Sequence, residues 1–324
     1  MNMLALYSRD LGKGSTKYRL AQYIEYFKTK ELNVRLANRD SINKSLINEV
    51  GRFDILLNQK YLFNYSLSKK LIENSRRVIF DFDDAIYTRP GKPYSLIAGF
   101  RVKRRMQLWL KRSDVVTTSS FFLSEYAKKF TDSVEIVPMA LDLDLWKPKE
   151  KSHGDRSITI GWAGAPVNIN LIEQLYEVLS GLQNKYPSIK LSIFSGRKPE
   201  LSCLFDYHPF QPGLEPDFVQ NLDIGLLPLN DDEFYRGKSP IKAIQYIACG
   251  VPVIGNIIGA TGEILNNENS IAVSGSKEWF DALETLILRR DLLKSMGDAG
   301  RKHAEKKFSF KTVADNFYNI ISGR

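Results

Sequence analysis

This sequence predicts an α/β protein with two doubly wound parallel sheets, and three observations support that expectation. Short apolar runs alternate with longer segments of helical periodicity from one end of the chain to the other. The segment 147–155 is polar, contains Pro148 and Gly154, and separates one such series from a second. The length of 324 residues suits two domains. We therefore expect an N-terminal domain at 1–146, a linker at 147–156 and a C-terminal domain at 157–308.

The first series predicts six strands and a helix after the first of them. Apolar, β-rich runs lie at 4–8, 34–37, 54–57, 77–82, 115–119 and 134–138. Within residues 18–28, the apolar residues Leu20, Tyr23, Ile24 and Phe27 have the spacing of one helix face. Strand followed by helix, repeated, predicts a parallel sheet that is covered on both sides.

The second series starts again after the linker. Its expected strands are at 158–162, 190–194, 223–228, 251–255 and 270–273, with helices near 171–184, 240–248 and 277–289. Ligands of doubly wound sheets bind outside the carboxyl ends of the strands, so we expect the site between the two domains.

The composition excludes several classes of protein. Hydrophobic residues make up 43% and charged residues 26%, which excludes a disordered chain. Two cysteines and three histidines are too few for a disulfide framework or a Cys/His zinc cluster. No stretch approaches the ~20 apolar residues of a membrane-spanning helix. The formal net charge of +9 favours anionic partners, and we expect a cytoplasmic protein that is peripheral to the inner face of the membrane at most.

The most informative stretch is 223–255. An apolar strand ends at Pro228, an acidic loop follows, and Ser239 and Pro240 stand where a helix N-cap and first residue belong. A helix start at the carboxyl end of a parallel strand offers unpaired N–H groups and a positive dipole end, beside which Lys238 adds a full charge. This pattern predicts a phosphate site; a solvated lysine at a loop tip is the alternative.

Two glycine-containing turns open the two series. Gly12, Gly14 and Ser15 follow the first strand, and the segment Gly161–Gly164 ends the first strand of the second series. Each would let a ligand approach the backbone closely, and an ordinary tight turn explains each equally well. Neither matches the dinucleotide-binding fingerprint, and Asp232 stands where a Walker A loop ending at Lys238 and Ser239 would need glycine.

Three segments together resemble glycosyltransferase family 4, whose members are retaining enzymes with the GT-B fold of two Rossmann-like domains. The segments are 223–255, GWAGAPVN at 161–168 and FDFDDAIY at 80–87. The resemblance implies a metal-independent hexosyltransferase, without a cofactor, that acts in cell-surface polysaccharide synthesis. Its donor would be a nucleotide diphosphate sugar, usually a UDP-sugar, held by the C-terminal domain. Its acceptor would be a glycan or lipid-linked saccharide on the N-terminal domain, onto which the helix at 309–324 would cross back.

The donor side implied by the resemblance departs from the family pattern. The E-x7-E motif falls on Gly237 and Gln245, so neither glutamate is present, although Gln245 can still hydrogen-bond a ribose hydroxyl. The family's Arg/Lys pair is also missing, which leaves Lys238 to stabilise the leaving diphosphate. Further donor-side residues implied are Gly164, Asn168, Arg197, Glu233, Ser239 and Glu263. For Arg197, Glu233 and Glu263, a surface charge without a function stays open as the alternative.

The acceptor side depends on the run FDFDDAIY. Burying three carboxylates at the end of a strand costs free energy unless they have a function or contact solvent. The resemblance implies that Asp83 or Asp84 orients the acceptor hydroxyl, on the same side as Gly12, Gly14, Ser15 and Arg19. Asp81 and Asp83 also match the nucleophile and acid of haloacid-dehalogenase phosphatases, which is the alternative enzyme. A sugar-nucleotide-binding module without catalysis is a further alternative, because the glutamates are missing.

A basic helical segment lies at 101–112. Six of its residues, from Arg101 to Arg112, are basic, and Met106, Leu108, Trp109 and Leu110 lie among them. This pattern suits an anionic membrane surface, and a helix whose apolar side packs on the sheet fits equally well; both can hold at once. We do not expect nucleic acid as a partner, because no stacking platform or recognition motif accompanies the charge.

Overall fold

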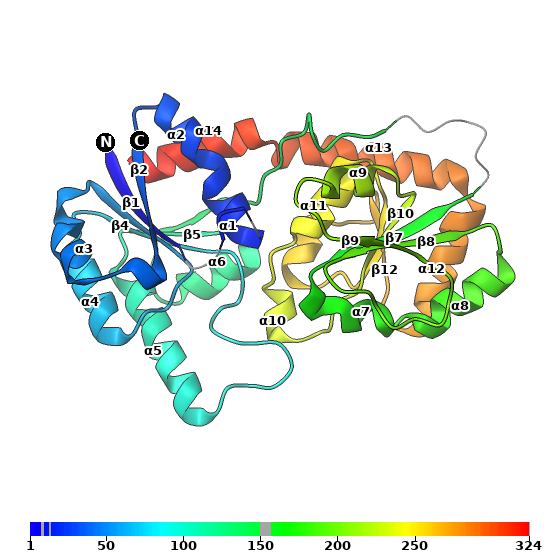
Figure 1. Cartoon of the computed structure of the whole chain (residues 1–324), viewed down its shortest axis with the longest axis horizontal. Coiled ribbons are helices and arrows are strands. Elements are labelled where there is room, and N and C mark those ends of the chain that lie inside the picture. The colour runs from blue at the N-terminus through cyan, green and yellow to red at the C-terminus, as the bar shows by residue number, and fades with distance from the viewer. Residues whose placement is uncertain (8–9, 13, 150–156, 324) are drawn as a thin grey trace. The chain divides into compact units, whose positions relative to one another are not determined.

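The computed structural model describes residues 1–7, 10–12, 14–149 and 157–323 (Figure 1). Most of the expected linker, at 150–156, therefore lies outside the described residues. The chain divides into two compact units: unit 1 comprises Met1–Ala140, Asp232–Ser239 and Lys311–Arg324, and unit 2 comprises Leu141–Asp231 and Pro240–Phe310. The segment Asp232–Ser239, expected in the C-terminal domain, thus belongs to unit 1.

Unit 1 is built on a six-stranded parallel sheet in the order β2-β1-β3-β4-β5-β6. The strands are β1 (Asn2–Tyr7), β2 (Asn33–Asn38), β3 (Ile55–Gln59), β4 (Val78–Phe82), β5 (Val115–Thr118) and β6 (Val134–Ile136). The helices are α1 (Gly14–Arg19), α2 (Ile24–Thr29), α3 (Lys44–Glu49), α4 (Tyr65–Glu73), α5 (Leu96–Arg112), α6 (Phe121–Lys128), α10 (Glu233–Arg236) and α14 (Phe310–Ser322).

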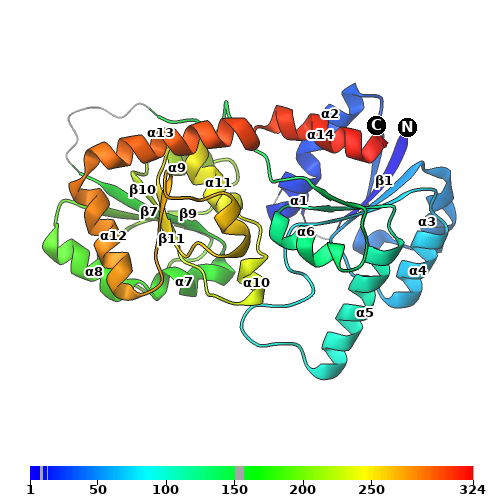
Figure 2. The same cartoon turned by 180° about the vertical axis from the view of Figure 1, so that it is seen from behind.

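Unit 2 has a second six-stranded parallel sheet, in the order β12-β11-β10-β7-β8-β9. Its strands are β7 (Thr159–Gly164), β8 (Lys190–Ser195), β9 (Asp206–Pro209), β10 (Ile224–Leu227), β11 (Val253–Gly255) and β12 (Ser270–Ala272). Its helices are α7 (Ile169–Glu173), α8 (Tyr176–Lys185), α9 (Glu215–Gln220), α11 (Ile241–Ala248), α12 (Ser276–Leu288) and α13 (Arg290–Lys307). Helices cover both faces of each sheet (Figure 1, Figure 2), so the predicted fold class is confirmed.

Two predicted helices are interrupted and one strand was not predicted. The helix expected near 171–184 is divided into α7 and α8 by a turn at 174–175. The single helix expected at 18–28 is interrupted, because Leu20 leaves the helical conformation at φ −136° and a 3-10 turn, Ala21–Tyr23, separates α1 from α2. Strand β9 was not predicted from the sequence. It is a four-residue edge strand with mostly exposed side chains and a proline at its end, so it lacks the apolar signal of a central strand.

The C-terminal helix α14 packs on unit 1 through an aromatic cluster. The buried ring of Phe317 meets the rings of Tyr23 and Phe27 edge-on, with centroid distances of 5.3 and 5.7 Å. The Arg77 guanidinium donates to the carbonyls of Ile320 and Ile321 at 2.9 and 2.8 Å. A cation at these last carbonyls suits the negative end of the helix dipole.

Candidate active site

In each sheet the strand order reverses direction at one point, where the chain moves from one side of the first strand to the other. In unit 1 it lies between β1 and β3, and in unit 2 between β7 and β10. Ligands of doubly wound sheets bind outside the carboxyl ends of the strands at such points. The turn with Gly12, Gly14 and Ser15 follows β1, and Gly164 ends β7. Several of the predicted residues therefore lie where this rule expects a ligand.

Asp81 is held in a buried ion pair and is not available as a nucleophile. Arg19 contacts both of its carboxylate oxygens, and Thr117 Oγ1 donates to one of them at 2.7 Å. Arg19 also donates to the carbonyl of Val137. Both charged side chains are almost fully buried. This corrects the expectation that Arg19 faces an acceptor, and the phosphatase alternative is not favoured, because it needs a reactive Asp81.

Lys60 brings together the other two carboxylates of the run. Its Nζ lies 2.9 Å from Asp83 Oδ1 and 2.5 Å from Asp84 Oδ2. The side chain of Lys60 is 8% exposed, that of Asp83 is buried, and that of Asp84 is 24% exposed. Lys60 also has a left-handed φ of 48°. Such strain costs about 1–3 kcal/mol in a non-glycine residue and is often found at functional sites.

The three groups have different proton affinities. Burial raises the pKa of Asp83 to about 6, opposed by the charge of Lys60. Burial also favours a raised pKa at Asp84, but Lys60 and the Ser239 N–H outweigh it, so the pKa of Asp84 is lowered. For Lys60, burial is outweighed by the two carboxylates, and its pKa is raised. Asp84 is therefore an ionised, partly exposed carboxylate that can accept a hydrogen bond from a hydroxyl group.

Sequence reasoning missed Lys60. Two features could have indicated it: it directly follows a buried strand, and the adjacent expected strand ends in the DFDD run. The pairing of β3 with β4 sets Gln59 beside Asp81, and the Lys60 N–H donates to the Asp81 carbonyl at 2.7 Å. This register brings the lysine to the carboxylates.

The segment 232–239 packs against the DFDD run within unit 1. Ser239 N–H donates to Asp84 Oδ1 at 3.1 Å. Gly237 is buried, and a Cβ at this position would lie 2.7 Å from the Cβ of Ala85 and 3.1 Å from Leu123. A glutamate side chain has no room there, which is consistent with the glycine at the position where the resemblance implied a glutamate.

Lys238 stands in a partly buried position beside these groups. Its Nζ lies 4.9 Å from the centre of the Tyr235 ring, and its charge contributes to the lowered pKa of Asp84. The Lys238 N–H donates to the Tyr235 carbonyl at 3.2 Å. With the Ser239 N–H bonded to Asp84, the backbone amides of Lys238 and Ser239 both have protein acceptors, so neither is open to a phosphate.

Helix α11 begins one residue later than predicted. Pro240 is its N-cap, without a side-chain cap bond, and Ile241 is its first residue. The expectation that Ser239 is the N-cap is therefore wrong, because Pro240 takes that position and Ser239 lies one residue before it. The first-turn N–H groups, of Ile241 to Ala243, have no acceptor within the helix and are the backbone groups suited to an anion.

The acidic loop before α10 has both local and long-range contacts within unit 1, and the Gly91 N–H donates to Asp232 Oδ2 at 3.4 Å. Asp232 caps α10 by accepting a hydrogen bond from the Tyr235 N–H at 2.9 Å. Glu233 is exposed at the first position of the helix. Burial and the Glu233 charge together raise the pKa of Tyr126 to about 12, in a ring stacked on Tyr87 with centroids 3.6 Å apart.

The residues of unit 2 that we predicted for the donor side differ widely in exposure. Gly164 ends β7 so close to the Trp162 indole that a Cβ would lie 2.0 Å from it. Asn168 ends a 3-10 turn and is partly buried, and Gln245 is buried on α11. These three positions lie on or beside the elements expected to bind the donor.

The charged residues of unit 2 that we predicted for the donor side are closer to solvent. Arg197 is exposed and stands 3.9 Å from Glu173, which is the geometry of a weak surface pair. Glu263 is partly buried at the end of the 3-10 turn Gly259–Glu263.

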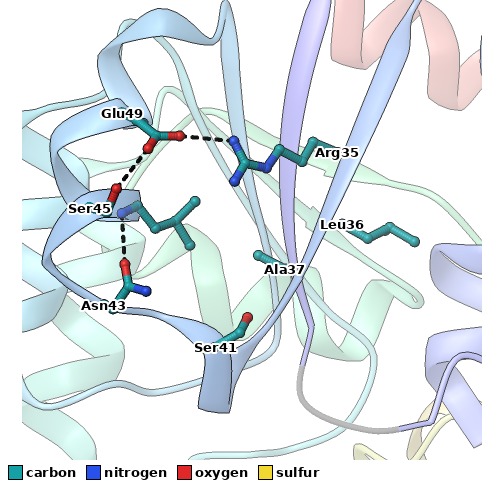
Figure 3. Close-up of a pocket in the computed structure, with 8 residues that line it drawn as sticks. Arg35, Leu36, Ala37, Ser41, Asn43, Ser45 and Glu49 are labelled. Carbon is teal, nitrogen blue, oxygen red and sulfur yellow. Dashed lines mark hydrogen bonds and ion pairs between the residues drawn. The ribbon is translucent and has the colours of Figure 1, made fainter.

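A pocket of about 180 Å³ lies elsewhere, between β2 and α3 (Figure 3). Arg35 and Glu49 pair across it at 3.0 Å, and Ser45 donates to Glu49 at 2.8 Å. None of the predicted site residues lines this pocket. In the part of the chain that the structure describes, no three His, Cys, Asp or Glu side chains are grouped to hold a metal ion. Within the same ranges, no helix is both long and apolar enough to cross a bilayer.

No family model matches the chain, but several curated proteins do. It is 25% identical over 222 residues to the MMP α-(1→4)-mannosyltransferase of Mycolicibacterium hassiacum, covering 62% of this chain and 52% of the relative. It is 22% identical over 217 residues to a putative teichuronic acid biosynthesis glycosyltransferase of Bacillus subtilis, with coverages of 58% and 52%. A capsular polysaccharide biosynthesis glycosyltransferase of Staphylococcus aureus is 25% identical over 198 residues, with coverages of 55% and 51%. The chain spans about half the length of these relatives.

Solved structures match over the whole chain. Anabaena HepE, in complex with UDP and glucose, superposes with a TM-score of 0.74 at 11% identity, covering 100% of both chains. Sucrose-phosphate synthase from Thermosynechococcus elongatus gives 0.75 at 12% identity, with 99% and 98% covered. The chain has the GT-B fold. The relatives, which are glycosyltransferases, support the resemblance to family 4 within this fold.

The ion pair between Arg19 and Asp81 should be important for stability in this GT-B protein. Arg19→Met leaves a buried carboxylate unpaired, so we expect the free energy of unfolding to fall by about 3–5 kcal/mol. Urea unfolding followed by circular dichroism measures it. The control Arg76→Met removes an exposed pair of the same unit with Asp54 and should cost less than about 1 kcal/mol. Equal stability of the two variants would contradict the assigned role.

Proposed function

We propose that this chain is a retaining glycosyltransferase that transfers a sugar from a UDP-sugar to a glycan or lipid-linked saccharide in cell-surface polysaccharide synthesis. The GT-B fold supports this, as do relatives named for teichuronic acid and capsular polysaccharide synthesis. The UDP complexes of Anabaena HepE support the choice of nucleotide. The observation that carries the proposal is the cluster of Lys60, Asp83 and Asp84 at the carboxyl ends of β3 and β4.

On the acceptor side, Asp84 is the group that meets the reacting hydroxyl. It is ionised and partly exposed, so it can accept the hydrogen bond of an acceptor hydroxyl and orient its oxygen. Lys60 acts through Asp84 and is a positioning residue, because its ammonium fixes one carboxylate oxygen at 2.5 Å. Asp83 is the second carboxylate beside the Lys60 ammonium, at 2.9 Å, and its raised pKa makes it the one that is more readily protonated.

On the donor side, Lys238 and the first-turn amides of α11 hold the diphosphate, and Gln245 contacts the ribose. Lys238 precedes α11 by only three residues of chain. A helix N-terminus and a lysine stabilise the charge that grows on the leaving diphosphate without requiring a metal ion. The proposal also includes Gly164, which ends β7, and Asn168, which ends the 3-10 turn that follows.

Peripheral membrane association is also part of the proposal. A lipid-linked saccharide acceptor would be found at a membrane surface. The net charge of +9 and the basic helix α5 favour an anionic one.

Replacing Lys238 should affect donor turnover more than donor binding. In Lys238→Ala, we expect kcat to fall about 10²–10³-fold, as when one group that stabilises the leaving charge is removed. Release of UDP from UDP-glucose measures the rate, and thermal shifts with UDP report affinity. The control Lys277→Ala removes an exposed lysine of α12 and should behave as wild type. A Lys238→Ala enzyme with wild-type kcat would exclude this assignment.

The carboxylate cluster predicts a dependence on pH. Lowering the pH through about 6 protonates Asp83, so Lys60 then binds Asp84 more strongly and makes it a poorer acceptor. We expect the wild-type rate to fall on the acid side of about pH 6 and Asp83→Asn to lack this decrease. An unchanged pH profile in Asp83→Asn would argue against the coupling.

Replacing Lys60 tests its positioning role. Lys60→Met should lower kcat with little change in the donor KM, and Lys60→Arg should recover part of the lost kcat.

A further inference from the structure

Helix α5 begins with a turn of exposed apolar side chains, which we call the apolar turn: Leu96, Ile97 and Phe100. They are 94%, 67% and 67% exposed. The second half of the helix is different, since Met106, Trp109 and Leu110 are buried in the core of unit 1. In both views the N-terminal end of α5 projects away from the sheet of this unit (Figure 1, Figure 2). The apolar turn therefore contributes nothing to the core.

The sequence around the apolar turn is strongly basic. From residue 89 to residue 112 it contains eight Lys and Arg residues and no Asp or Glu. Arg101 and Lys103 are exposed in the turn that follows, while Arg104 lies over the ring of Tyr65 at 4.2 Å. Lys111 and Arg112 lie at the far end of the helix, about 15 Å further along its axis. The cations nearest the apolar turn are thus Arg101, Lys103 and, on the approach, Lys92.

The backbone leading to the apolar turn is held in place. Arg89 donates to the carbonyls of Lys92 and Pro93 at 2.6 and 2.8 Å. Ser95 is the N-cap of α5 and accepts a hydrogen bond from the Ala98 N–H at 3.4 Å. The three apolar side chains are therefore presented by a formed helix end.

An anionic membrane matches both properties of this surface. Its apolar layer can take up large aliphatic and aromatic side chains, and its headgroups attract the cations beside them. The same surface of a second copy is a poorer match, because it carries the same excess of positive charge and the chain has a net charge of +9. Charge complementarity thus favours lipid over self-association.

We propose that Leu96, Ile97 and Phe100 insert into an anionic membrane while Arg101 and Lys103 contact its headgroups. This proposal rests on the proposed function in one respect: a lipid-linked acceptor would be reached at the membrane. It also changes the expectation for residues 101–112: the apolar side of that segment is buried in unit 1, and the insertion site is the turn before it.

The test uses the full chain and sedimentation with vesicles of phosphatidylcholine alone or mixed with phosphatidylglycerol. We expect wild type to bind the anionic vesicles at least about tenfold more tightly, and salt to weaken the binding. The double variant Leu96→Asp/Phe100→Asp should lose at least about tenfold in affinity. The variant Arg101→Gln/Lys103→Gln should lose about 25-fold. The control Leu204→Asp changes another highly exposed leucine, in unit 2, and should bind as wild type.

Two outcomes would overturn the proposal. One is equal binding of wild type and the Leu96→Asp/Phe100→Asp variant to the anionic vesicles, with both folded by circular dichroism. The other is absence of vesicle binding together with a wild-type dimer that the same variant makes monomeric, which would assign the apolar turn to self-association. Release of UDP from UDP-glucose without vesicles is measured in parallel. If UDP is not released but vesicle binding is intact, the proposed transferase activity is refuted and the proposed membrane contact is not.

Discussion

The ammonium group of Lys60, enclosed by Asp83 and Asp84, is the interaction on which the candidate site depends. Two carboxylates this close could not both stay ionised at a buried strand end without a counter-charge. One lysine cannot balance both, so burial decides between them. Asp83 is the more deeply buried and has the raised pKa, and Asp84 reaches solvent and has the lowered one. Asp81 is paired with Arg19 and does not depend on Lys60 for a counter-charge.

Asp84 also links this cluster to the segment that leads into α11. Its second carboxylate oxygen accepts the Ser239 N–H, and Gly237 lies against Ala85 without room for a side chain. Residues 232–239 therefore belong to unit 1, although both the preceding and the following chain belong to unit 2. Asp84 thus accepts one hydrogen bond that holds the neighbour of Lys238 in place, and the bond is stronger while the carboxylate is ionised.

The sequence predicted the sheets well because their central strands are buried on both faces and read as apolar runs. The edge strand β9 gives no such signal. The site was harder to predict. From the sequence alone, Arg19 could bind a ligand or form a structural ion pair. The partner that decides between the two roles, Asp81, is 62 residues away. Lys60 acquires its role from the pairing of β3 with β4 and from a left-handed backbone, neither of which a local pattern reports.

Helix α5 shows that exposure decides a role that composition leaves open. Trp109 and Leu110 belong to the same basic amphipathic helix as Leu96 and Phe100, and hydropathy does not separate the two sets. The first set fills the core, where Trp109 stacks on Phe80 and donates to Ser68 Oγ at 3.1 Å. The second set has no core to fill, since the helix extends beyond the sheet before it begins to pack. A buried stripe and an exposed apolar end can therefore share one helix, one stabilising unit 1 and the other available to a surface.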